Sequence, residues 1–209
     1  SLLVEGGFQT LHDTLDDRRR ALYDPERLAQ RFLWFEHVCL PSWRRQTDPD
    51  FRLIVATGQD FPPEWLERLR ALMADVPQIV LHQAEPARHR PLCRRILRRF
   101  TDPGADVCAQ FRIDDDDAVA VDYVARLRAD FAKVEPLYRA DGRIWIDHCR
   151  GFTLATPPDG MMVTAQVADR MAAALAICKP PADPECVMDF AHHKVGQVMN
   201  GVVLQDDWM

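Results

Sequence analysis

Apolar and polar positions follow two alternating periodicities over the first 135 residues. The helical period predicts helices at 25–45, 62–75, 91–100 and 119–134, with a break at Pro41 and an end at Pro136. Short apolar runs between them predict buried strands at 51–57, 78–82 and 107–113. Strands separated by helices of this length imply right-handed βαβ crossovers. We therefore expect an α/β fold with a mostly parallel sheet flanked by helices.

The pattern changes beyond Pro136. Residues 143–148 and 151–155 predict two antiparallel strands joined by a tight link. Residues 171–178 are compatible with a strand or a helix, whereas 179–185, KPPADPE, suit neither. We expect one domain over 1–209, made of a first half to about residue 135 and a small mixed part over 136–209.

Composition narrows the class of protein. Hydrophobic residues at 47% and charged residues at 28% are ordinary for a globular chain, and a net charge of −6 argues against nucleic acid as a partner. Six cysteines without a C-x-x-C pair predict reduced thiols, so we expect a cytoplasmic protein. No signal peptide is recognised, and no run reaches the ~20 apolar residues of a membrane span.

The strongest chemical signal lies in residues 107–120, VCAQFRIDDDDAVA. Four aspartates follow an apolar strand, where α/β sheets bind ligands, and they repel one another unless cations compensate. Helix capping would explain one or two of them. Asp114 and Asp116 form a D-x-D, whose hard oxygen ligands suit Mg²⁺ or Mn²⁺. An EF-hand is excluded by Val119, which stands where its loop needs glycine.

Two further groups bear on this chemistry. Arg88 and Arg90 lie near the N-terminus of the predicted helix at 91–100 and are candidates to bind a diphosphate. The arginines over 94–99 predict a solvated basic face. His192 and His193 are candidates for a further metal ligand. Together the aspartates, arginines and histidines predict the handling of a nucleoside diphosphate through a divalent cation.

These residues resemble a known family. FRIDDDDAVAVDYV is similar to the D-x-D region of GT-A-fold glycosyltransferases. A GGFQ opening, R-x-x-L-Y-D-P-E-R-L, R-F-x-x-F-E, L-P-S and Q-T-D-P-D-F are similar to the bacterial family named for rhamnosyltransferases. The resemblance covers residues 6–128 closely and the rest loosely.

The resemblance implies a GT-A-like (Rossmann-like) enzyme that moves a sugar, rhamnose by the family label, from a nucleotide-sugar donor to a saccharide or other hydroxyl acceptor. The first half would bind the donor and the second half the acceptor. The implied ligands of Mn²⁺ or Mg²⁺ are Asp114, Asp116, Asp117 and His192, with His193 as the alternative to His192. The implied nucleotide contacts are Thr57, Asp60, Arg88, Arg90 and Asp114.

Inversion at the sugar needs a general base near the acceptor hydroxyl. Asp147 and Asp189 are the candidates we select, with Glu185, Asp206 and Asp207 as further carboxylates in the same half. A GT-A domain also opens with a strand central to its sheet. Only residues 2–4 precede the glycines here, so we expect that strand to be missing.

Other functions remain open at this stage. A nucleotidyltransferase also uses metal-binding carboxylates, but it normally has a glycine-rich phosphate loop, which is not visible here. A haloacid-dehalogenase-type phosphatase has its D-x-D on the first strand, whereas this one follows two predicted βα units. The third alternative is an inactive or truncated nucleotide-binding module, which the expected lack of the first strand favours.

Overall fold

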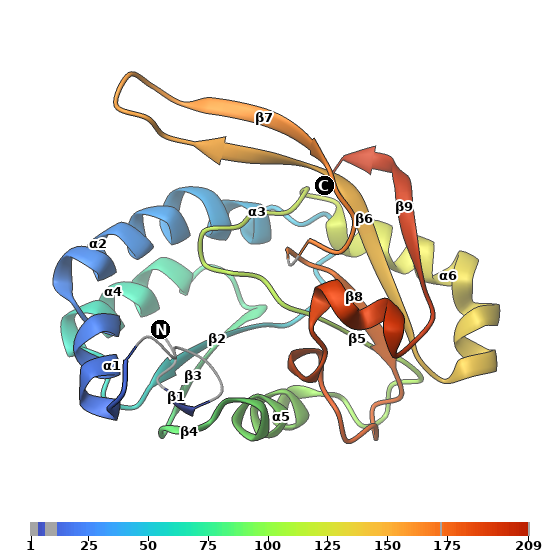
Figure 1. Cartoon of the computed structure of the whole chain (residues 1–209), viewed down its shortest axis with the longest axis horizontal. Helices are drawn as coiled ribbons and strands as arrows, with labels where there is room; N and C mark the ends of the chain where they lie inside the picture. The colour runs from blue at the N-terminus through green and yellow to red at the C-terminus, as the bar shows by residue number, and fades with distance from the viewer. Residues whose placement is uncertain (1–3, 7–11, 172, 209) are drawn as a thin grey trace. The chain divides into compact units, whose positions relative to one another are not determined.

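The computed structural model describes residues 4–6, 12–171 and 173–208. The chain separates into two compact units (Figure 1). Unit 1 comprises Ser1–Thr101 and Asp114–Ala118, and unit 2 comprises Asp102–Ile113 and Val119–Met209. The segment with the four aspartates therefore belongs to the N-terminal unit, although the strand before it belongs to the other.

The helices predicted in unit 1 begin within two residues of their expected positions, but a first helix at 15–22 was not predicted. After α1 (Leu15–Leu22), α2 (Pro25–Trp34) begins with Asp24 as N-cap, whose side chain accepts the N–H of Arg27 at 2.9 Å. A π-helical turn, η1 (Phe35–Cys39), then leads into α3 (Leu40–Arg44). Pro41 has no N–H to donate, and the predicted break takes the form of this wider turn.

Two pairs of parallel strands form the rest of unit 1. β2 (Leu53–Gly58) pairs with β3 (Ile79–Ala84) and is joined to it by α4 (Pro63–Met73). β1 (Val4–Gly6) pairs with β4 (Ala87–Arg88), which leads into α5 (His89–Phe100). The predicted βα pattern is confirmed here, with element bounds shifted by a few residues.

A short N-terminal strand is present where we expected the central first strand of a GT-A sheet to be missing; within the described residues it pairs with β4 alone and is not central to a larger sheet. Val4 on β1 is buried in a cluster with Ala84, Leu92 and Ile96. The Arg18 guanidinium donates to the backbone oxygens of Val4 and Glu5, at 3.2 and 2.5 Å, and so fixes β1 beside α1. Burial of one apolar side chain and pairing with β4 suffice to order three residues. The GGFQ motif at 6–9 lies largely outside the described residues.

Unit 2 contains a mixed five-stranded sheet. Its strands are β5 (Cys108–Phe111), β8 (Ala176–Lys179), β6 (Ile144–Ala155) and β7 (Met162–Val167), in that order, and β9 (Gly201–Trp208) pairs with β6. Only the pair of β6 with β9 is parallel. The long helix α6 (Tyr123–Asp141) and the 3₁₀ turns η2 (Val187–Asp189) and η3 (His192–Gln197) complete this unit.

Three predictions for unit 2 need correction. β5 pairs antiparallel with β8, so the strand before the aspartates is not part of a parallel sheet. Residues 144–155 form one strand, because β6 changes partner from β9 to β7 at Arg150 without turning back. Helix α6 begins later than predicted and continues past Pro136, which removes one helical hydrogen bond, until Gly142 ends it in the left-handed conformation (φ 74°).

The α/β class is confirmed by these elements, with parallel pairs in unit 1 and a mixed sheet in unit 2. A search of the described helices found none both long and apolar enough to cross a membrane.

Candidate functional site

The four aspartates form a turn in unit 1, where the N–H of Asp117 donates to the carbonyl of Asp114 at 3.2 Å. Arg31 from α2 faces this turn. It forms an ion pair with Asp115 and binds both oxygens of Asp116, at 2.8 and 3.1 Å. No described Lys or Arg forms an ion pair with Asp114 or Asp117. One guanidinium thus compensates two of four neighbouring carboxylates.

The pKa of Asp117 reflects both burial and the negative charge that Arg31 does not compensate. Burial raises the pKa of this carboxyl, and repulsion from Asp114 and Asp116 raises it further, against a smaller opposing effect of Arg31. Asp114 and Asp116 are exposed. The turn therefore offers accessible carboxylate oxygens beside a carboxyl that a cation would help to ionise.

A second group lies at the carboxyl end of β2. Thr57 is 2% exposed, and its hydroxyl has no hydrogen-bond partner among the described residues. Asp60 accepts a 2.9 Å bond from the Tyr23 hydroxyl and forms an ion pair with Arg19. Burial alone would raise the pKa of Asp60, but the bonds from Arg19 and Tyr23 lower it overall.

Gly58 is needed between these two residues. A Cβ at this position would lie 2.2 Å from the Tyr23 hydroxyl oxygen, because the phenol crosses directly over the backbone there. Tyr23 also packs edge-on against Phe61, with ring centroids 5.6 Å apart. The loop after β2 is thus held by α1 on one side.

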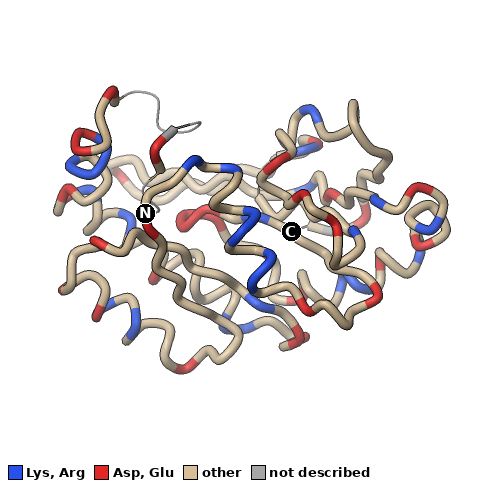
Figure 2. Tube along the Cα trace, turned by 90° about the horizontal axis from the view of Figure 1, so that it is seen from below, with Lys and Arg blue, Asp and Glu red and all other residues tan. Residues whose placement is uncertain are grey.

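Arg88 and Arg90 are both exposed at the start of α5. Arg88 occupies the N-cap position without a side-chain cap. Basic residues follow one another along this helix (Figure 2), and the arginines over 94–99 are exposed, as the sequence predicted. Leu92, Cys93 and Ile96 form the buried face.

In unit 2, three residues form a chain of short hydrogen bonds. The backbone N–H of Arg170 donates to Asp147 Oδ2 at 2.5 Å, and the backbone oxygen of Arg170 lies 2.6 Å from His192 Nδ1. A carbonyl can only accept, so Nδ1 of His192 bears a hydrogen, and in the neutral ring the lone pair is on Nε2. Arg170 itself adopts φ 53°, in the left-handed region. The two bonds hold an unfavourable backbone conformation in place.

Asp147 is 2% exposed at the centre of β6, and burial raises the pKa of its carboxyl. The bond from the Arg170 N–H opposes that shift. Asp189, the other predicted base, accepts the N–H of Cys186 at 2.7 Å in the cap of η2. Both candidates therefore already bind backbone of unit 2.

The further carboxylates considered as general bases lie in different surroundings. Glu185 is bound to Arg143 at 2.6 Å, together with Asp183. Asp206 is exposed on β9, and the side chain of Asp207 lies outside the described residues.

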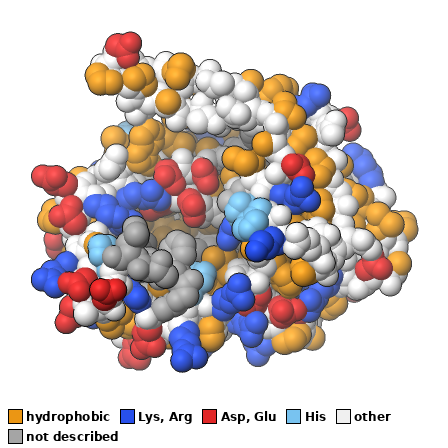
Figure 3. Space-filling model, in the orientation of Figure 1, with side chains coloured by type: hydrophobic (Ala, Val, Ile, Leu, Met, Phe, Trp, Pro, Cys, Tyr) orange, Lys and Arg blue, Asp and Glu red, His pale blue; other side chains and the backbone are white. Residues whose placement is uncertain are grey.

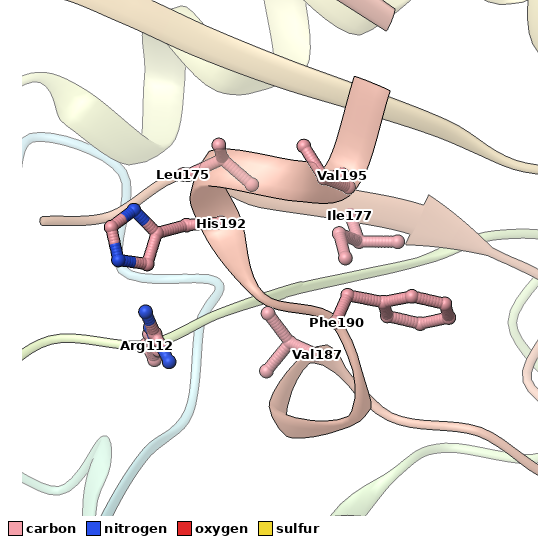
Figure 4. Close-up of a pocket in the computed structure, with 7 residues that line it drawn as sticks. All are labelled: Arg112, Leu175, Ile177, Val187, Phe190, His192 and Val195. Atoms are coloured by element: carbon pink, nitrogen blue, oxygen red, sulfur yellow. The ribbon is translucent and has the colours of Figure 1, made fainter. Parts of the chain in front are cut away.

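His192 also borders a small hollow of about 230 Å³ in unit 2 (Figure 4). Arg112 and His192 lie together at one end, and apolar side chains close the rest. The Arg112 side chain makes no hydrogen bond or ion pair within the described part of the chain. The lining residues are Arg112, Leu175, Ile177, Val187, Phe190, His192 and Val195.

The predicted metal ligands are divided between the units. Asp114, Asp116 and Asp117 lie in unit 1, and His192 lies in unit 2. Within the described residues, no three His, Cys, Asp or Glu side chains are gathered into a group ready to hold a metal. A cation bound at the aspartate turn would complete its coordination with water or with oxygen atoms of a ligand.

Sequence reasoning missed the partners of the predicted residues. Arg31 precedes Asp116 by 85 residues, and Arg19 precedes Asp60 by 41. Arg31 falls within the R-F-x-x-F-E motif and Arg19 opens the R-x-x-L-Y-D-P segment, so the only available signal was their place in those motifs. Arg112 lies two residues before Asp114 and could have been noted as the basic residue nearest to the aspartate run.

A sequence model of the protein family described as "Putative rhamnosyl transferase" matches residues 1–209. Searches among curated proteins and among solved structures gave no significant match.

Proposed function

The chain belongs to this family of glycosyltransferases, and we propose that it transfers a sugar from a nucleoside-diphosphate donor to a hydroxyl acceptor with the help of a divalent cation. The family label favours rhamnose as the sugar. The observation that supports the proposal best is the uncompensated charge of the aspartate turn. Asp114 and Asp116 are exposed there, and the pKa of Asp117 is raised by burial and by its two neighbours.

The residues of the turn suit Mg²⁺ or Mn²⁺. Such ions are commonly held by one or two carboxylates together with phosphate oxygens of the substrate. A turn without three preassembled ligands agrees with that mode of binding. When bound, the cation would supply positive charge that offsets the negative charge of the departing nucleoside diphosphate. We propose Asp114 and Asp116 as its carboxylate ligands, with Asp117 beside them.

The other residues of unit 1 have roles in holding the nucleotide. The buried hydroxyl of Thr57 has no hydrogen-bond partner among the described residues and can bond to a ligand, and Arg19 and Tyr23 lower the pKa of Asp60. Thr57 lies in β2 next to its last residue and Asp60 follows that strand, so we propose that they contact the nucleoside. Arg88 and Arg90, exposed at the N-terminus of α5, are proposed to bind the diphosphate.

In unit 2 the free Nε2 of His192 is suited to a metal. Histidines that bind metals usually donate their other ring N–H to a carbonyl or carboxylate, as Nδ1 does here to Arg170. We propose His192 as a ligand on this basis. Because Asp147 is buried and binds the Arg170 N–H, we assign it the positioning of this segment rather than contact with the acceptor. The general base would then be a different residue, one that contacts the acceptor hydroxyl.

A thermal-shift screen of UDP, GDP, dTDP and CDP, each with and without Mn²⁺, tests the proposal. We expect one nucleotide to stabilise the protein only when Mn²⁺ is present, by about 2.7 kcal/mol at a concentration of 100 Kd. No stabilisation by any nucleotide would contradict a nucleotide-sugar transferase.

The products formed from the matching nucleotide sugar then separate the alternatives. A glycosyltransferase without acceptor slowly releases the nucleoside diphosphate and the free sugar. A nucleotidyltransferase instead exchanges labelled pyrophosphate into nucleoside triphosphate. A binding module gives the thermal shift but neither product, and that result would refute the catalytic part of the proposal.

A further inference from the structure

The hairpin of β6 and β7 extends beyond the rest of its sheet (Figure 1). β6 pairs with β8 over Ile144–Ile146 and with β9 as far as Arg150. From Gly151 to Ala155 it pairs with β7 alone, and β7 is the edge strand of the sheet. All six residues of β7 are exposed. This half of the hairpin is thus two strands with neither face covered within unit 2.

The two faces of the hairpin differ in chemistry. Residues directly opposite in an antiparallel pair share a face, and here Phe152 pairs with Ala165 and Leu154 with Val163. Thr153 pairs with Thr164 on the other face. Trp208 of β9 stacks on Phe152 with ring centroids 4.9 Å apart and extends the apolar side. Arg150 pairs with Val167 on this side, and its guanidinium lies over the Trp208 ring, 5.8 Å from the centroid. We call this side the hairpin face; its members are Arg150, Phe152, Leu154, Val163, Ala165, Val167 and Trp208, of which only Arg150 is charged.

The hairpin face is large enough for a protein interface. Phe152, Val163 and Val167 are 58, 57 and 69% exposed. The whole face leaves on the order of 500 Å² of apolar surface exposed, near the upper end for a monomer. One side of a standard interface buries about 800 Å², of which roughly 60%, or about 500 Å², is apolar.

The charges around the hairpin narrow the choice of partner. Residues 151–169 contain two aspartates and no lysine or arginine; of the two arginines that flank this range, Arg150 lies on the hairpin face and Arg170 forms an ion pair with Asp169. Figure 3 shows the visible end of the hairpin with hydrophobic groups, one acidic group and no basic ones. Interfacial binding to an anionic membrane relies on Lys and Arg around the apolar face, so such a surface is disfavoured. The single charge of the face, Arg150, lies at the base of the hairpin over the Trp208 ring, so the apolar surface beyond it can pack on an identical one without repulsion.

We propose that the hairpin face binds the same face of a second copy of the chain. The two hairpins pack sheet on sheet about a two-fold axis, which is the commonest symmetry of homo-oligomers. Each copy buries Phe152, Val163 and Val167 against the other. This association is independent of nucleotide, metal and the proposed transferase activity.

Light scattering coupled to size exclusion tests the proposal. At about 50 μM chain we expect a mass of twice 24.0 kDa for the parent. Val163→Glu places a charge in the apolar face and should give a monomer. Thr164→Glu adds the same charge one residue along β7 on the opposite face and should remain a dimer. Far-ultraviolet circular dichroism confirms that both variants are folded.

Three results would overturn the proposal. A parent that is monomeric at this concentration has no such interface. Equal loss of the dimer in both variants would indicate pairing through the edge of β7 instead of through its face. Flotation of a monomeric parent with phosphatidylglycerol vesicles, lost in Val163→Glu, would identify a membrane as the occupant of the face.

Discussion

Aspartates occur in two contrasting settings in this protein. The turn at 114–117 in unit 1 gathers four carboxylates around one guanidinium, with two of them exposed. Asp147 in unit 2 lies in the buried first part of β6, where its carboxylate accepts a backbone N–H. Burial raises the pKa of both Asp117 and Asp147, but repulsion between neighbouring carboxylates contributes chiefly at Asp117.

The difference shows what a shifted pKa means at each place. At Asp147 the shift accompanies a satisfied hydrogen bond that holds Arg170 in a left-handed conformation, which is a structural role. At Asp117 the shift reflects charges that the described chain does not neutralise. A carboxylate charge that the described residues do not neutralise indicates a ligand site more strongly than a raised pKa that accompanies burial and a satisfied hydrogen bond.

The largest expected effect comes from the turn. Asp116→Asn keeps the shape of the side chain but removes a negative oxygen, so we expect a loss of Mn²⁺-dependent nucleotide affinity of at least ~100-fold. Isothermal titration with and without Mn²⁺ measures it. Asp159→Asn, an exposed position between β6 and β7, is the matched control and should bind as the parent does. Unchanged binding by Asp116→Asn would show that the aspartates shape the local turn and do not bind the metal.

Asp147 should affect stability first. Asp147→Ala leaves the Arg170 N–H without its acceptor, so we expect the free energy of unfolding to fall by about 1–3 kcal/mol in urea titrations. Asp147→Asn keeps an acceptor oxygen and should lose less.

The same variants test the assigned positioning role. Long-range ¹H–¹⁵N spectra report which nitrogen of His192 bears the hydrogen. We expect the Nδ1–H form in the parent and a mixture in Asp147→Ala. Arg170→Gly, which suits φ 53° and keeps the backbone bonds, should retain the Nδ1–H form. An unchanged ring in Asp147→Ala would remove the link between Asp147 and His192.

A smaller and pH-dependent effect is expected at Asp117. Its pKa is higher in the folded than in the unfolded state, so its stabilising contribution is complete below the unfolded value of about 3.9 and is lost as pH rises through the folded value. Asp117→Asn should therefore be the more stable protein at pH 7, by up to ~1 kcal/mol. Thermal melts at pH 7 and pH 3 should show that this advantage disappears in acid. A variant less stable at pH 7 would mean that Asp117 is already compensated.

The smallest effect on stability is expected at Thr57. Thr57→Val replaces an unpaired buried hydroxyl by a methyl group, so the free energy of unfolding should stay within ~0.5 kcal/mol or rise. Nucleotide affinity should nevertheless fall by about 3–10-fold if the hydroxyl bonds to the nucleoside. Titration of both proteins with the nucleotide from the thermal screen measures this. Equal affinity would exclude Thr57 from the site.

Local patterns in the sequence predicted much of unit 1. Asp24 before Pro25 marks the start of α2, and the apolar runs around β2 and β3 mark two buried strands. These signals act within a few residues, through capping bonds and side-chain periodicity, and therefore appear in the sequence itself. The same reasoning identified the aspartate run and its excess of charge.

Unit 2 shows where such signals end. The prediction that β5 is part of a parallel sheet was wrong, because its direction depends on pairing with β8, almost seventy residues later. Gly151 suggested a link between two strands. β6 continues through this residue because it pairs with β9 before Gly151 and with β7 from Arg150 onward.

The sequence by itself determined the α/β class, the helices of unit 1 after α1, and the concentration of carboxylates at 114–117. Only the tertiary structure decided that Arg31 faces those carboxylates, that Asp147 is joined to His192 through Arg170, and that one face of the β6–β7 hairpin is apolar and uncovered. The physical reason is distance along the chain. Periodicity and capping depend on near neighbours, whereas charge compensation, burial and strand pairing depend on residues that folding alone brings together.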